Sequence, residues 1–309
     1  MPSDAEQSTG HGVMSFTSGG AARVLAGACR RAGLDSGGAR LLRFGENALF
    51  RLAAHPVVVR IARSAEYLDA VRGEIRVSRW LTRTGFPVTR VIEDLEQPMV
   101  VDGRPVTFWH LIEEGDRKPT YGELGAVLRD LHALSPPDSL ALRPYPALGR
   151  TDRRIAAAVG IPEDDRAFLR KRAQELRERV ASLRFESRKC AVHGDAHVQN
   201  LMVDRTGQVI LIDLERFSFD HPEWDLMVTA TEHYSLGWQT MEQYGAFVGA
   251  YGRDLGGWPG FPTLRALQEF KMTTWLMQNV AENAETAEEY ARRISSLRNE
   301  DEPRAWKPG

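Results

Sequence analysis

Residues suited to phosphoryl transfer gather in one short stretch of the sequence. A polar loop contains Asp195 and Asn200, and Asp213 follows the apolar run at 209–212. The turn at 204–207 joins two short apolar segments, which predicts a hairpin with all three side chains at one end. Phosphoryl transfer needs such a set, in which one carboxylate orients a hydroxyl and accepts its proton, while an amide oxygen and a second carboxylate hold Mg²⁺ on the phosphates of a nucleotide.

The order of these residues matches the motif of a known family. The family's loop reads His-Gly-Asp, four variable residues and then Asn, and a metal-binding Ile-Asp pair follows. The matching positions are His193, Gly194, Asp195, Asn200, Ile212 and Asp213. On these residues the chain resembles the aminoglycoside phosphotransferase and choline kinase group, which are small-molecule relatives of the protein kinases. The resemblance implies that Asp195 is the catalytic base and that Asn200 and Asp213 bind Mg²⁺.

A second family motif lies downstream, where the family reads Gly-Asp-Pro, two residues and then Asp-Leu. Here Pro222, Asp225 and Leu226 agree, whereas Asp220 and His221 replace the usual Gly-Asp. The resemblance implies a supporting role for Asp225 in the catalytic site.

Two histidines lie in the catalytic loop. By the resemblance, His193 packs and hydrogen-bonds to hold the loop, and we favour that role over acid–base chemistry. His197 has two interpretations, a residue that fills the loop or a contact to substrate or phosphate. A zinc site from His193 and His197 is disfavoured, because the sequence clusters no further ligands around them.

The resemblance also implies a nucleotide site in the N-terminal part of the chain. Gly45 and Asn47 match the family's nucleotide loop, and Glu74 lies where the family's helix glutamate pairs with a strand lysine. Arg60 occupies the lysine position, and the first lysine of the chain is Lys118, so no other lysine of this lobe replaces it. An arginine grips phosphates bidentately, with a geometry that differs from the point charge of a lysine.

The hinge of the family falls on residues 109–112 of this chain. In the family this segment meets adenine through backbone groups, which implies Trp109 and Leu111 as nucleotide contacts. The nucleotide is ATP or GTP, and the sequence does not separate the two.

The first part of the chain reads as strands around one helix. β-branched and apolar runs predict strands at 41–44, 48–52, 57–61, 88–93, 98–101 and 105–112. Helical spacing of apolar residues predicts a helix that starts after an N-cap at Ser64 and ends near Gly85. We expect a five-strand sheet with this helix inserted after the third strand.

The rest of the chain reads mainly as helices. Periodic apolar residues predict helices at 121–134, 162–183, 264–280 and 284–298, with further helical structure from Trp224 onward. The layout is an α+β, protein-kinase-like fold with two lobes and the site between them. We expect a disordered tail at 1–20, a nucleotide-binding lobe at 21–114, and a catalytic and acceptor-binding lobe at 115–309.

Composition narrows the class of function. The formal net charge of -2 supplies no basic field for nucleic acid and no polybasic anchor for a membrane. No apolar run reaches the roughly 18 residues of a membrane span. The two cysteines, Cys29 and Cys190, are too few for a disulfide framework, so we expect a cytoplasmic protein with both as buried apolar residues.

The sequence predicts a small-molecule kinase that transfers the γ-phosphate to a hydroxyl of an antibiotic or a metabolite. The missing strand lysine keeps a nucleotide-binding pseudokinase open, and a nucleotidyl transferase on the same fold is a further alternative. A hydrolase is the weakest alternative, because no Gly-x-Ser-x-Gly or zinc-helix motif occurs. The oligomeric state is not predicted.

The acceptor site has only weak signals. Four tryptophans of the helical part suit the core or the wall of an acceptor pocket, namely Trp224, Trp238, Trp258 and Trp275. Four glutamates suit either attraction of a cationic acceptor or a solvated helix face, namely Glu282, Glu285, Glu288 and Glu289.

Overall fold

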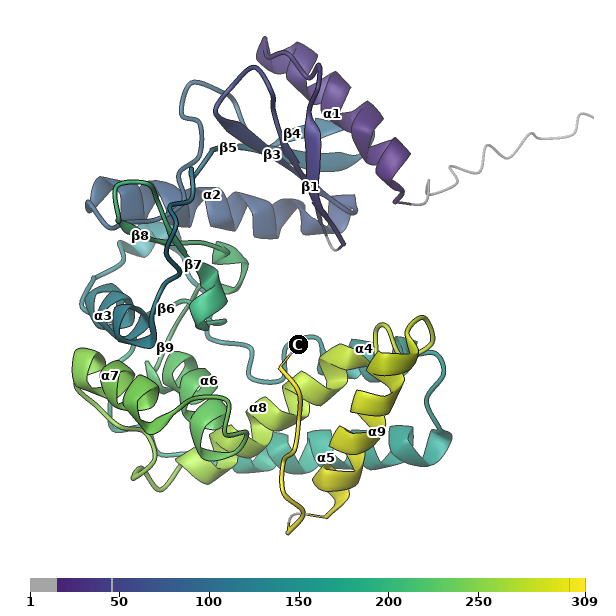
Figure 1. The fold of residues 1–309 in the computed structure, drawn as a ribbon, viewed down its shortest axis with the longest axis vertical. Helices are drawn as coiled ribbons and strands as arrows, with labels where there is room; N and C mark the ends of the chain where they lie inside the picture. The colour runs from purple at the N-terminus through teal and green to yellow at the C-terminus, as the bar shows by residue number, and fades with distance from the viewer. Residues whose placement is uncertain (1–15, 46, 300, 309) are drawn as a thin grey trace, which may run out of the picture. The chain divides into compact units, whose positions relative to one another are not determined.

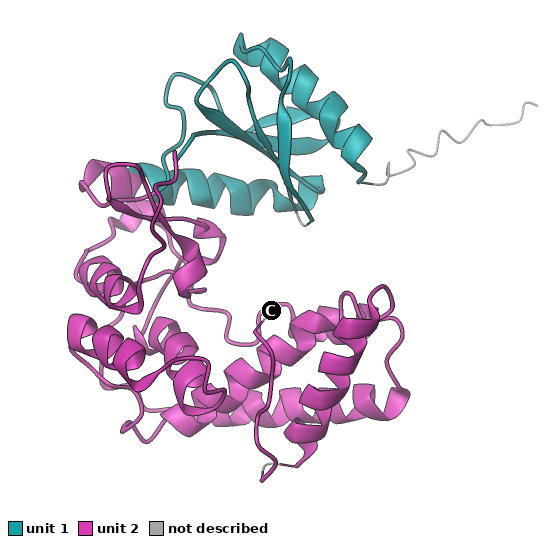
Figure 2. Cartoon of the chain, viewed as in Figure 1, with its two compact units in different colours: residues 1–79, 89–112 teal, residues 80–88, 113–309 magenta. Residues whose placement is uncertain are grey.

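The computed structural model describes residues 16–45, 47–299 and 301–308, and these form two compact units (Figure 2). The first unit comprises residues up to 79 together with 89–112, and the second comprises 80–88 and the chain from 113 onward. We expected one lobe over 21–114, so the segment 80–88 departs from that expectation. It joins the second unit because Pro87 O accepts a hydrogen bond from Leu211 N (3.0 Å) and Trp80 packs edge-on against Phe217.

The first unit is built on an antiparallel sheet of five strands (Figure 1). The strands are β1 (Arg40–Phe44), β2 (Asn47–Arg51), β3 (Val57–Ala62), β4 (Met99–Val101) and β5 (Arg104–His110). Their order across the sheet is β1-β2-β3-β5-β4, with Val58 opposite Trp109 in the centre. The expected five-strand sheet is therefore confirmed, and it is built from five of the six predicted strand segments.

The strand predicted at 88–93 does not form. Val91 makes an isolated bridge to Trp109, and Val88 makes another to Leu211 of the second unit. The backbone of this segment bonds to Leu211 at one end and to Trp109 further along, so it does not pair with either partner over the length of a strand.

Helices cover both faces of this sheet (Figure 1). Helix α1 (Ser18–Ala32) packs its apolar side, including Val24 and Leu25, on the face that carries Val59 and Phe108. Helix α2 (Leu68–Arg83) lies on the opposite face, where Val71 belongs to a separate cluster. Burial of these helix faces and of alternate strand positions stabilises the unit, at about 25 cal/mol for each Å² of apolar surface removed from water.

Helix α1 corrects the prediction of a tail over 1–20. Residues 18–20 form its first turn, with Thr17 Oγ1 accepting a hydrogen bond from Gly20 N (3.1 Å) as the N-cap. Residues 1–15 of that predicted tail lie outside the described residues. Ser64 is the N-cap residue of a short 3₁₀ turn (Ala65–Tyr67) that leads into α2, as predicted, although its side chain makes no cap hydrogen bond.

The second unit combines small two-stranded sheets with helices. Strands β6 (Cys190–Val192) and β9 (Ser218–Asp220) pair, as do β7 (Leu201–Val203) and β8 (Val209–Leu211). The helices are α3 (Tyr121–His132), α4 (Thr151–Ala157), α5 (Glu163–Ala181), α6 (Glu223–Tyr234), α7 (Met241–Tyr251), α8 (Phe261–Leu276) and α9 (Ala284–Arg298).

Most of these helices match the sequence prediction, and α9 has the predicted bounds. Helix α5 begins just after Pro162, which is its N-cap rather than its first helical residue. Helix α4, within the connection that precedes α5, was not predicted. Helix α8 packs against α4, α5, α6 and α9, and therefore forms the centre of this part of the unit (Figure 1).

Both cysteines are buried free thiols, which confirms that they act as small apolar residues in the core. Burial raises the pKa of Cys29 to about 11 and that of Cys190 to about 12, so neither is a reactive thiolate at neutral pH. Within the described residues, no helix has both the length and the apolar character needed to cross a bilayer.

Candidate active site

The loop that carries Asp195 follows strand β6 and needs a glycine at its turn. Gly194 has a φ of +82°, a conformation that residues with a Cβ rarely adopt. A Cβ at this position would lie 2.4 Å from the backbone oxygen of Arg216. The family motif therefore has a steric reason here, because the chain must pass close to Arg216 before it presents Asp195.

Asp225 anchors this loop from the first turn of helix α6. Its Oδ2 accepts a hydrogen bond from His193 N and its Oδ1 accepts one from Gly194 N, both at 2.7 Å. The Asp225 side chain is fully buried, so these hydrogen bonds form in a low-dielectric setting. Asp225 thus fixes the backbone on which Asp195 is carried.

His132, at the end of helix α3, completes this anchor. Its Nε2 lies 3.0 Å from Asp225 Oδ2 and its Nδ1 lies 3.0 Å from Tyr251 Oη, which fits the tautomer with the proton on Nε2. Burial alone would raise the pKa of Asp225, but the hydrogen bond from His132 and the amide of Gly194 outweigh burial and lower that pKa. Sequence reasoning missed His132, because a histidine at a helix C-terminus is a common dipole partner and signals nothing more.

His193 is fully buried beside the same loop. Its Nε2 lies 2.9 Å from Ile212 O, and its ring packs edge-on against Phe217. Among the described residues, His193 Nδ1 has no hydrogen-bond partner. The side chain ties the loop to the backbone that precedes Asp213.

Asn200 and Asp213 lie at the same end of the β7–β8 hairpin, as the sequence predicted. Leu201 pairs with Leu211 across the hairpin, and Ile212 N donates to Asn200 O (3.0 Å) beyond that pair. Asp213 has a φ of +61°, in the left-handed region that is strained for a residue with a side chain. Such strain is typical of functional positions that the surrounding structure holds in place.

The Asn200 amide is oriented by two hydrogen bonds. Its Nδ2 donates to Asp195 O (2.8 Å) and lies 3.1 Å from His197 Nε2. Burial is the main cause that lowers the pKa of His197, which favours a neutral ring that can accept this hydrogen bond at Nε2. With Nδ2 committed, Asn200 Oδ1 is the atom that remains for a cation. His197 therefore contacts Asn200 directly.

These two oxygen donors fit a magnesium ion but not a metal held by protein alone. In the part of the chain that the structure describes, no group of three or more His, Cys, Asp or Glu residues is arranged to bind a metal. Mg²⁺ usually takes one or two protein oxygens and completes its shell with phosphates and water. Asn200 Oδ1 and the Asp213 carboxylate match that donor set.

Asp195 itself is about one-third exposed, with a side-chain exposure of 35%. Its Oδ2 lies 3.8 Å from Arg216 Nε, a residue of the short 3₁₀ turn Leu214–Arg216. Burial would lower the pKa of Arg216, but the charges of Asp195, Tyr145 and Glu215 outweigh burial and raise it. The guanidinium therefore stays charged beside the carboxylate.

The first unit brings its predicted residues together around Arg60. Arg60 Nη1 donates to Glu74 Oε2 at 2.6 Å, and the Glu74 side chain is only 4% exposed. The Asn47 side-chain amide is oriented so that both of its polar atoms have partners. In this orientation Asn47 Oδ1 accepts hydrogen bonds from Arg60 Nη2 (2.9 Å) and Nε (3.2 Å). Gly45 lies next to this group, where its N–H donates to Asn47 O (3.0 Å).

The two hinge residues are placed differently from each other. Trp109 is inside the sheet, opposite Val58, and its indole Nε1 donates to Thr107 Oγ1 (2.8 Å). Leu111 lies just beyond β5, and its N–H donates to Pro56 O (2.8 Å). Of the two hinge residues, Leu111 is therefore the one whose carbonyl lies outside the sheet.

Helix α9 and the residues before it contain the four glutamates that we considered for a cationic acceptor. Glu289 is buried and pairs with Arg292 and Arg293, so its charge is balanced within the helix. Glu282, Glu285 and Glu288 are exposed. Of the four tryptophans, Trp224 and Trp258 are buried, Trp238 is half-buried and Trp275 is exposed.

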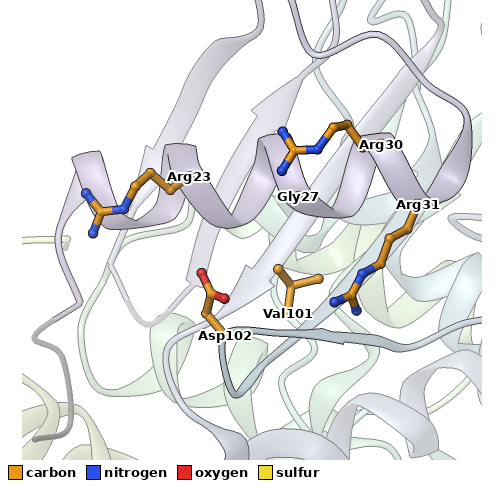
Figure 3. A pocket seen from close by; sticks show the side chains of 6 residues that line it. All are labelled: Arg23, Gly27, Arg30, Arg31, Val101 and Asp102. Carbon is orange, nitrogen blue, oxygen red and sulfur yellow. The ribbon is translucent and has the colours of Figure 1, made fainter.

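A surface pocket of about 320 Å³ lies beside helix α1, in the first unit (Figure 3). Its charged lining consists of Arg23, Arg30, Arg31 and Asp102, and Arg31 Nη1 also donates to Val100 O (2.9 Å). None of the predicted site residues lines this pocket, so it is separate from the candidate active site.

The chain matches the model of the phosphotransferase enzyme family, APH, over residues 44–270. No curated protein matches it by sequence. Among solved structures, it is similar to an amicoumacin kinase in complex with AMP-PNP, Ca²⁺ and Ami, with a TM-score of 0.70 and 16% identity. That match covers 93% of this chain and 97% of the kinase.

Two further solved structures are similar at the level of the fold. The microcompartment-associated aminopropanol kinase has a TM-score of 0.62 and 20% identity, over 84% of this chain and 89% of the kinase. The choline kinase of Streptococcus pneumoniae has a TM-score of 0.62 and 15% identity, over 89% of this chain and 98% of the kinase. These matches confirm the expected α+β, kinase-like fold.

Proposed function

Because this chain belongs to the phosphotransferase enzyme family, we propose that it transfers the γ-phosphate of a nucleoside triphosphate to a hydroxyl of a small molecule. The observation that carries this proposal is the loop anchored by Asp225, which presents Asp195 beside the hairpin end that holds Asn200 and Asp213. These are the parts that phosphoryl transfer needs, a base for the hydroxyl and oxygen donors for a cation on the phosphates.

Asp195 is the proposed catalytic base. Its carboxylate accepts a hydrogen bond from the acceptor hydroxyl, aligns that oxygen for in-line attack and receives its proton. Asp225 and His193 are proposed as positioning residues, because both are fully buried. Asp225 accepts a hydrogen bond from the loop backbone, and the His193 side chain contacts the backbone oxygen of Ile212. Arg216 lies beside the proposed base, with its Nε 3.8 Å from Asp195 Oδ2.

Mg²⁺ is the proposed cofactor, and Asn200 Oδ1 with the Asp213 carboxylate would hold it. When bound, Mg²⁺ neutralises charge on the nucleotide phosphates. The chain itself orients these groups: the hydrogen bond from Asn200 Nδ2 to the backbone oxygen of Asp195 joins a proposed metal ligand to the proposed base.

In the first unit, Arg60 is the proposed phosphate contact, with Glu74 and Asn47 fixing its guanidinium. A bidentate guanidinium can replace a lysine as a phosphate contact because it stays charged and offers paired donors. Gly45 and Trp109 are proposed to lie near the nucleotide, and the Leu111 carbonyl is proposed to accept from the amino group of adenine. ATP or GTP is the proposed donor, because solved relatives were captured with nucleotide ligands such as AMP-PNP and GDP.

The cellular setting follows from the same proposal. A kinase with two buried free thiols is suited to the reducing cytoplasm, where ATP is abundant. The proposed partner is a small molecule rather than a nucleic acid or a membrane.

The proposal is tested by mass analysis of the product after incubation with ATP, Mg²⁺ and a panel of hydroxyl compounds. The panel takes its first members from the names of solved relatives, namely choline, aminopropanol and spectinomycin. A product that gains one phosphoryl group supports the proposal. Gain of a nucleotidyl group would show a nucleotidyl transferase instead, and tight nucleotide binding without ATP turnover would show a pseudokinase.

Calorimetry of ATP binding tests the cation site separately. Binding is expected to depend on Mg²⁺ and to weaken at least about tenfold in Asp213→Ala. The matched control is Asp152→Ala, because Asp152 is an exposed residue of helix α4 outside the site. Equal affinity in Asp213→Ala and wild type would contradict the assignment of Asp213.

A further inference from the structure

Three arginines of helix α1 line one pocket on the surface of the first unit (Figure 3). The pocket has a volume of about 320 Å³, and its lining consists of Arg23, Gly27, Arg30, Arg31, Val101 and Asp102. The four helix residues follow the spacing of neighbouring turns, so they lie along one side of α1. The other side of the helix carries Leu25 and Cys29, which are buried against the sheet. The pocket is therefore built on a helix whose position is fixed by its buried side.

Gly27 leaves the floor of the pocket open. It lies in the middle of a helix, although glycine has a low helix propensity. A Cβ at this position would lie 3.0 Å from Val101 Cγ1 and 4.0 Å from Arg30 Nη2. These distances place the helix, strand β4 and the Arg30 guanidinium around one small space. A larger side chain at position 27 would fill that space.

The turn between β4 and β5 forms the facing wall of the pocket. Val101 ends β4, and Asp102 follows it in the left-handed conformation, with a φ of +48°. Arg31 reaches from the helix to this wall, where its Nη1 donates a hydrogen bond to Val100 O (2.9 Å). This hydrogen bond fixes Arg31 relative to the turn that carries the Asp102 carboxylate.

The pocket has an excess of positive charge. It is lined by three guanidinium groups and by one carboxylate, that of Asp102. In the described part of the chain, neither Arg23 nor Arg30 forms an ion pair, and Asp102 forms none. The Arg31 guanidinium bonds to a neutral carbonyl, which leaves its charge uncompensated. Positive charges gathered in a concave site attract an anion.

The arrangement of the guanidinium groups favours a phosphate over a carboxylate. A guanidinium donates paired hydrogen bonds in one plane, and a carboxylate accepts one such pair. A phosphate monoester has three terminal oxygens and a charge of about −1.5 to −2 at neutral pH, so it can accept from arginines on different sides. Arg23 and Arg30 come from separate turns of the helix, and Arg31 contacts the facing wall. Asp102 adds an acceptor for a hydroxyl group of the same ligand.

We propose that this pocket binds a small phosphate monoester that also carries a hydroxyl group. The volume lies at the lower end of the roughly 300 to 1,000 Å³ of small-molecule sites, which suits a metabolite rather than a polymer. This is a second ligand site, beyond the proposed kinase function, because none of the proposed catalytic, metal-binding or nucleotide-binding residues lines it.

Protection from phenylglyoxal tests the site in the wild-type protein. Phenylglyoxal modifies accessible arginines, and peptide mass analysis reads the rate of modification at each one. The probes are two matched sets at equal ionic strength, namely glycerol 3-phosphate, glycerate and glycerol, and glucose 6-phosphate, glucuronate and glucose. Arg83, an exposed residue in the last turn of α2, is the internal control.

The phosphate member of at least one set is expected to slow modification of Arg23 and Arg30 and to leave Arg83 unchanged. Equal protection by the carboxylate or the neutral member would overturn the proposal, as would no protection by either phosphate ester. Stronger protection by an oligonucleotide at the same concentration of phosphate would also overturn it, because the occupant would then be a nucleic acid.

Charge variants give a second measurement. In calorimetry, binding of the protecting ester should weaken about tenfold in Arg23→Gln and in Arg30→Gln, since each change removes a charge-assisted hydrogen bond. Arg83→Gln is the matched control and should bind the ester as wild type does. Wild-type affinity in both pocket variants would contradict the proposal.

A shape variant separates a built pocket from a general attraction of anions. Gly27→Gln keeps every charge but places a side chain in the pocket, so binding of the ester should weaken at least about tenfold. Gly245→Gln on α7 is the matched control, because a Cβ there meets no atom within 4 Å. Thermal unfolding verifies that both variants fold, and the arginine variants decide the outcome if Gly27→Gln does not. Undiminished affinity in folded Gly27→Gln would overturn the proposal.

The pocket and the proposed kinase function fail in different ways. Labelling and calorimetry use no nucleotide, so protection of Arg23 and Arg30 in a protein that transfers no phosphate would leave the pocket standing and remove the kinase function. Phosphate transfer by a protein that binds no ester at the pocket would leave the kinase function standing and remove the second site.

Discussion

Replacing Asp225 with asparagine removes the charge that anchors the catalytic loop. The carboxylate accepts hydrogen bonds from two backbone amides at 2.7 Å and from His132 at 3.0 Å, with no exposure to water. Asparagine keeps one acceptor oxygen but brings an NH₂ group toward donors, so at least one of these hydrogen bonds is lost. A hydrogen bond to a buried charge contributes about 1.5 to 3 kcal/mol, so the free energy of unfolding of Asp225→Asn should fall by about 3 kcal/mol.

Urea unfolding measures this loss. The midpoint should move to lower urea while the slope stays that of wild type, because the surface exposed on unfolding is unchanged. Phosphate transfer should fall as well, since the loop that carries Asp195 loses its anchor. The control is Asp152→Asn, which removes an exposed charge paired with Arg177 and should leave the midpoint almost unchanged.

The stability difference between wild type and Asp225→Asn should depend on pH in a defined direction. The pKa of Asp225 is lower in the folded state than in the unfolded chain, so its ionised form stabilises the fold above the unfolded pKa of about 3.9. This contribution is lost as the pH falls toward the folded pKa. Wild type should therefore lose its advantage over Asp225→Asn on acidification, and an equal midpoint for the two proteins at pH 7 would refute the reasoning.

Three further predictions concern packing, a buried acid and the phosphate contact. Gly125→Ala should destabilise the fold by about 2 kcal/mol or more, because the new Cβ would lie 2.4 Å from a backbone oxygen of α7. Gly249→Ala should stabilise the fold by up to about 1 kcal/mol, because a Cβ there would lie in open space on α7. Thermal unfolding of both variants checks this pair. Burial raises the pKa of Glu232 to about 7, so its charge destabilises the fold as the pH rises from the unfolded value of about 4.3 through 7. Glu232→Gln should accordingly raise the urea midpoint at pH 8 and change it little at pH 4, and the same shift at both values would contradict the assignment. Arg60→Ala should raise the KM for ATP about tenfold or more and Glu74→Gln less, because the second variant keeps the guanidinium; steady-state kinetics separate the two effects, and an unchanged KM in Arg60→Ala would rule out a phosphate contact.

Local signals predicted the parts of the fold that local structure determines. The helix that begins at Tyr121 has a capping box, in which Thr120 and Glu123 satisfy each other's backbone amides. The hairpin around 204–207 has a turn whose amides bond to the Asp204 side chain. Such features are encoded within a few residues, so the sequence alone identifies them.

The missed elements depend on tertiary contacts. Helix α1 begins with Ser18, Gly19 and Gly20, residues of low helix propensity, and it forms because its apolar side is buried on the sheet. The strand expected at 88–93 has a suitable composition, but its backbone divides between two partners. Neither outcome follows from composition or periodicity.

The candidate site shows the same division. The hairpin brings Asn200 and Asp213 together through short-range pairing, which the spacing anticipates. His132 is far from the catalytic loop in the sequence and joins the site only through the packing of α3, which brings its Nε2 to 3.0 Å from Asp225 Oδ2. Alone, His132 is an ordinary residue at the end of a helix, so no pattern marks it.

The rate of phosphate transfer in Asp195→Asn tests the central claim most directly. The side chain is isosteric and partly exposed, so nucleotide binding and the urea midpoint should match wild type. The loss of a general base should lower kcat by about 10² to 10⁴, with Asp204→Asn, a turn residue of the hairpin, as the control for a nearby carboxylate. Wild-type turnover in Asp195→Asn, with product formation intact, would contradict the assignment of Asp195 as the catalytic carboxylate.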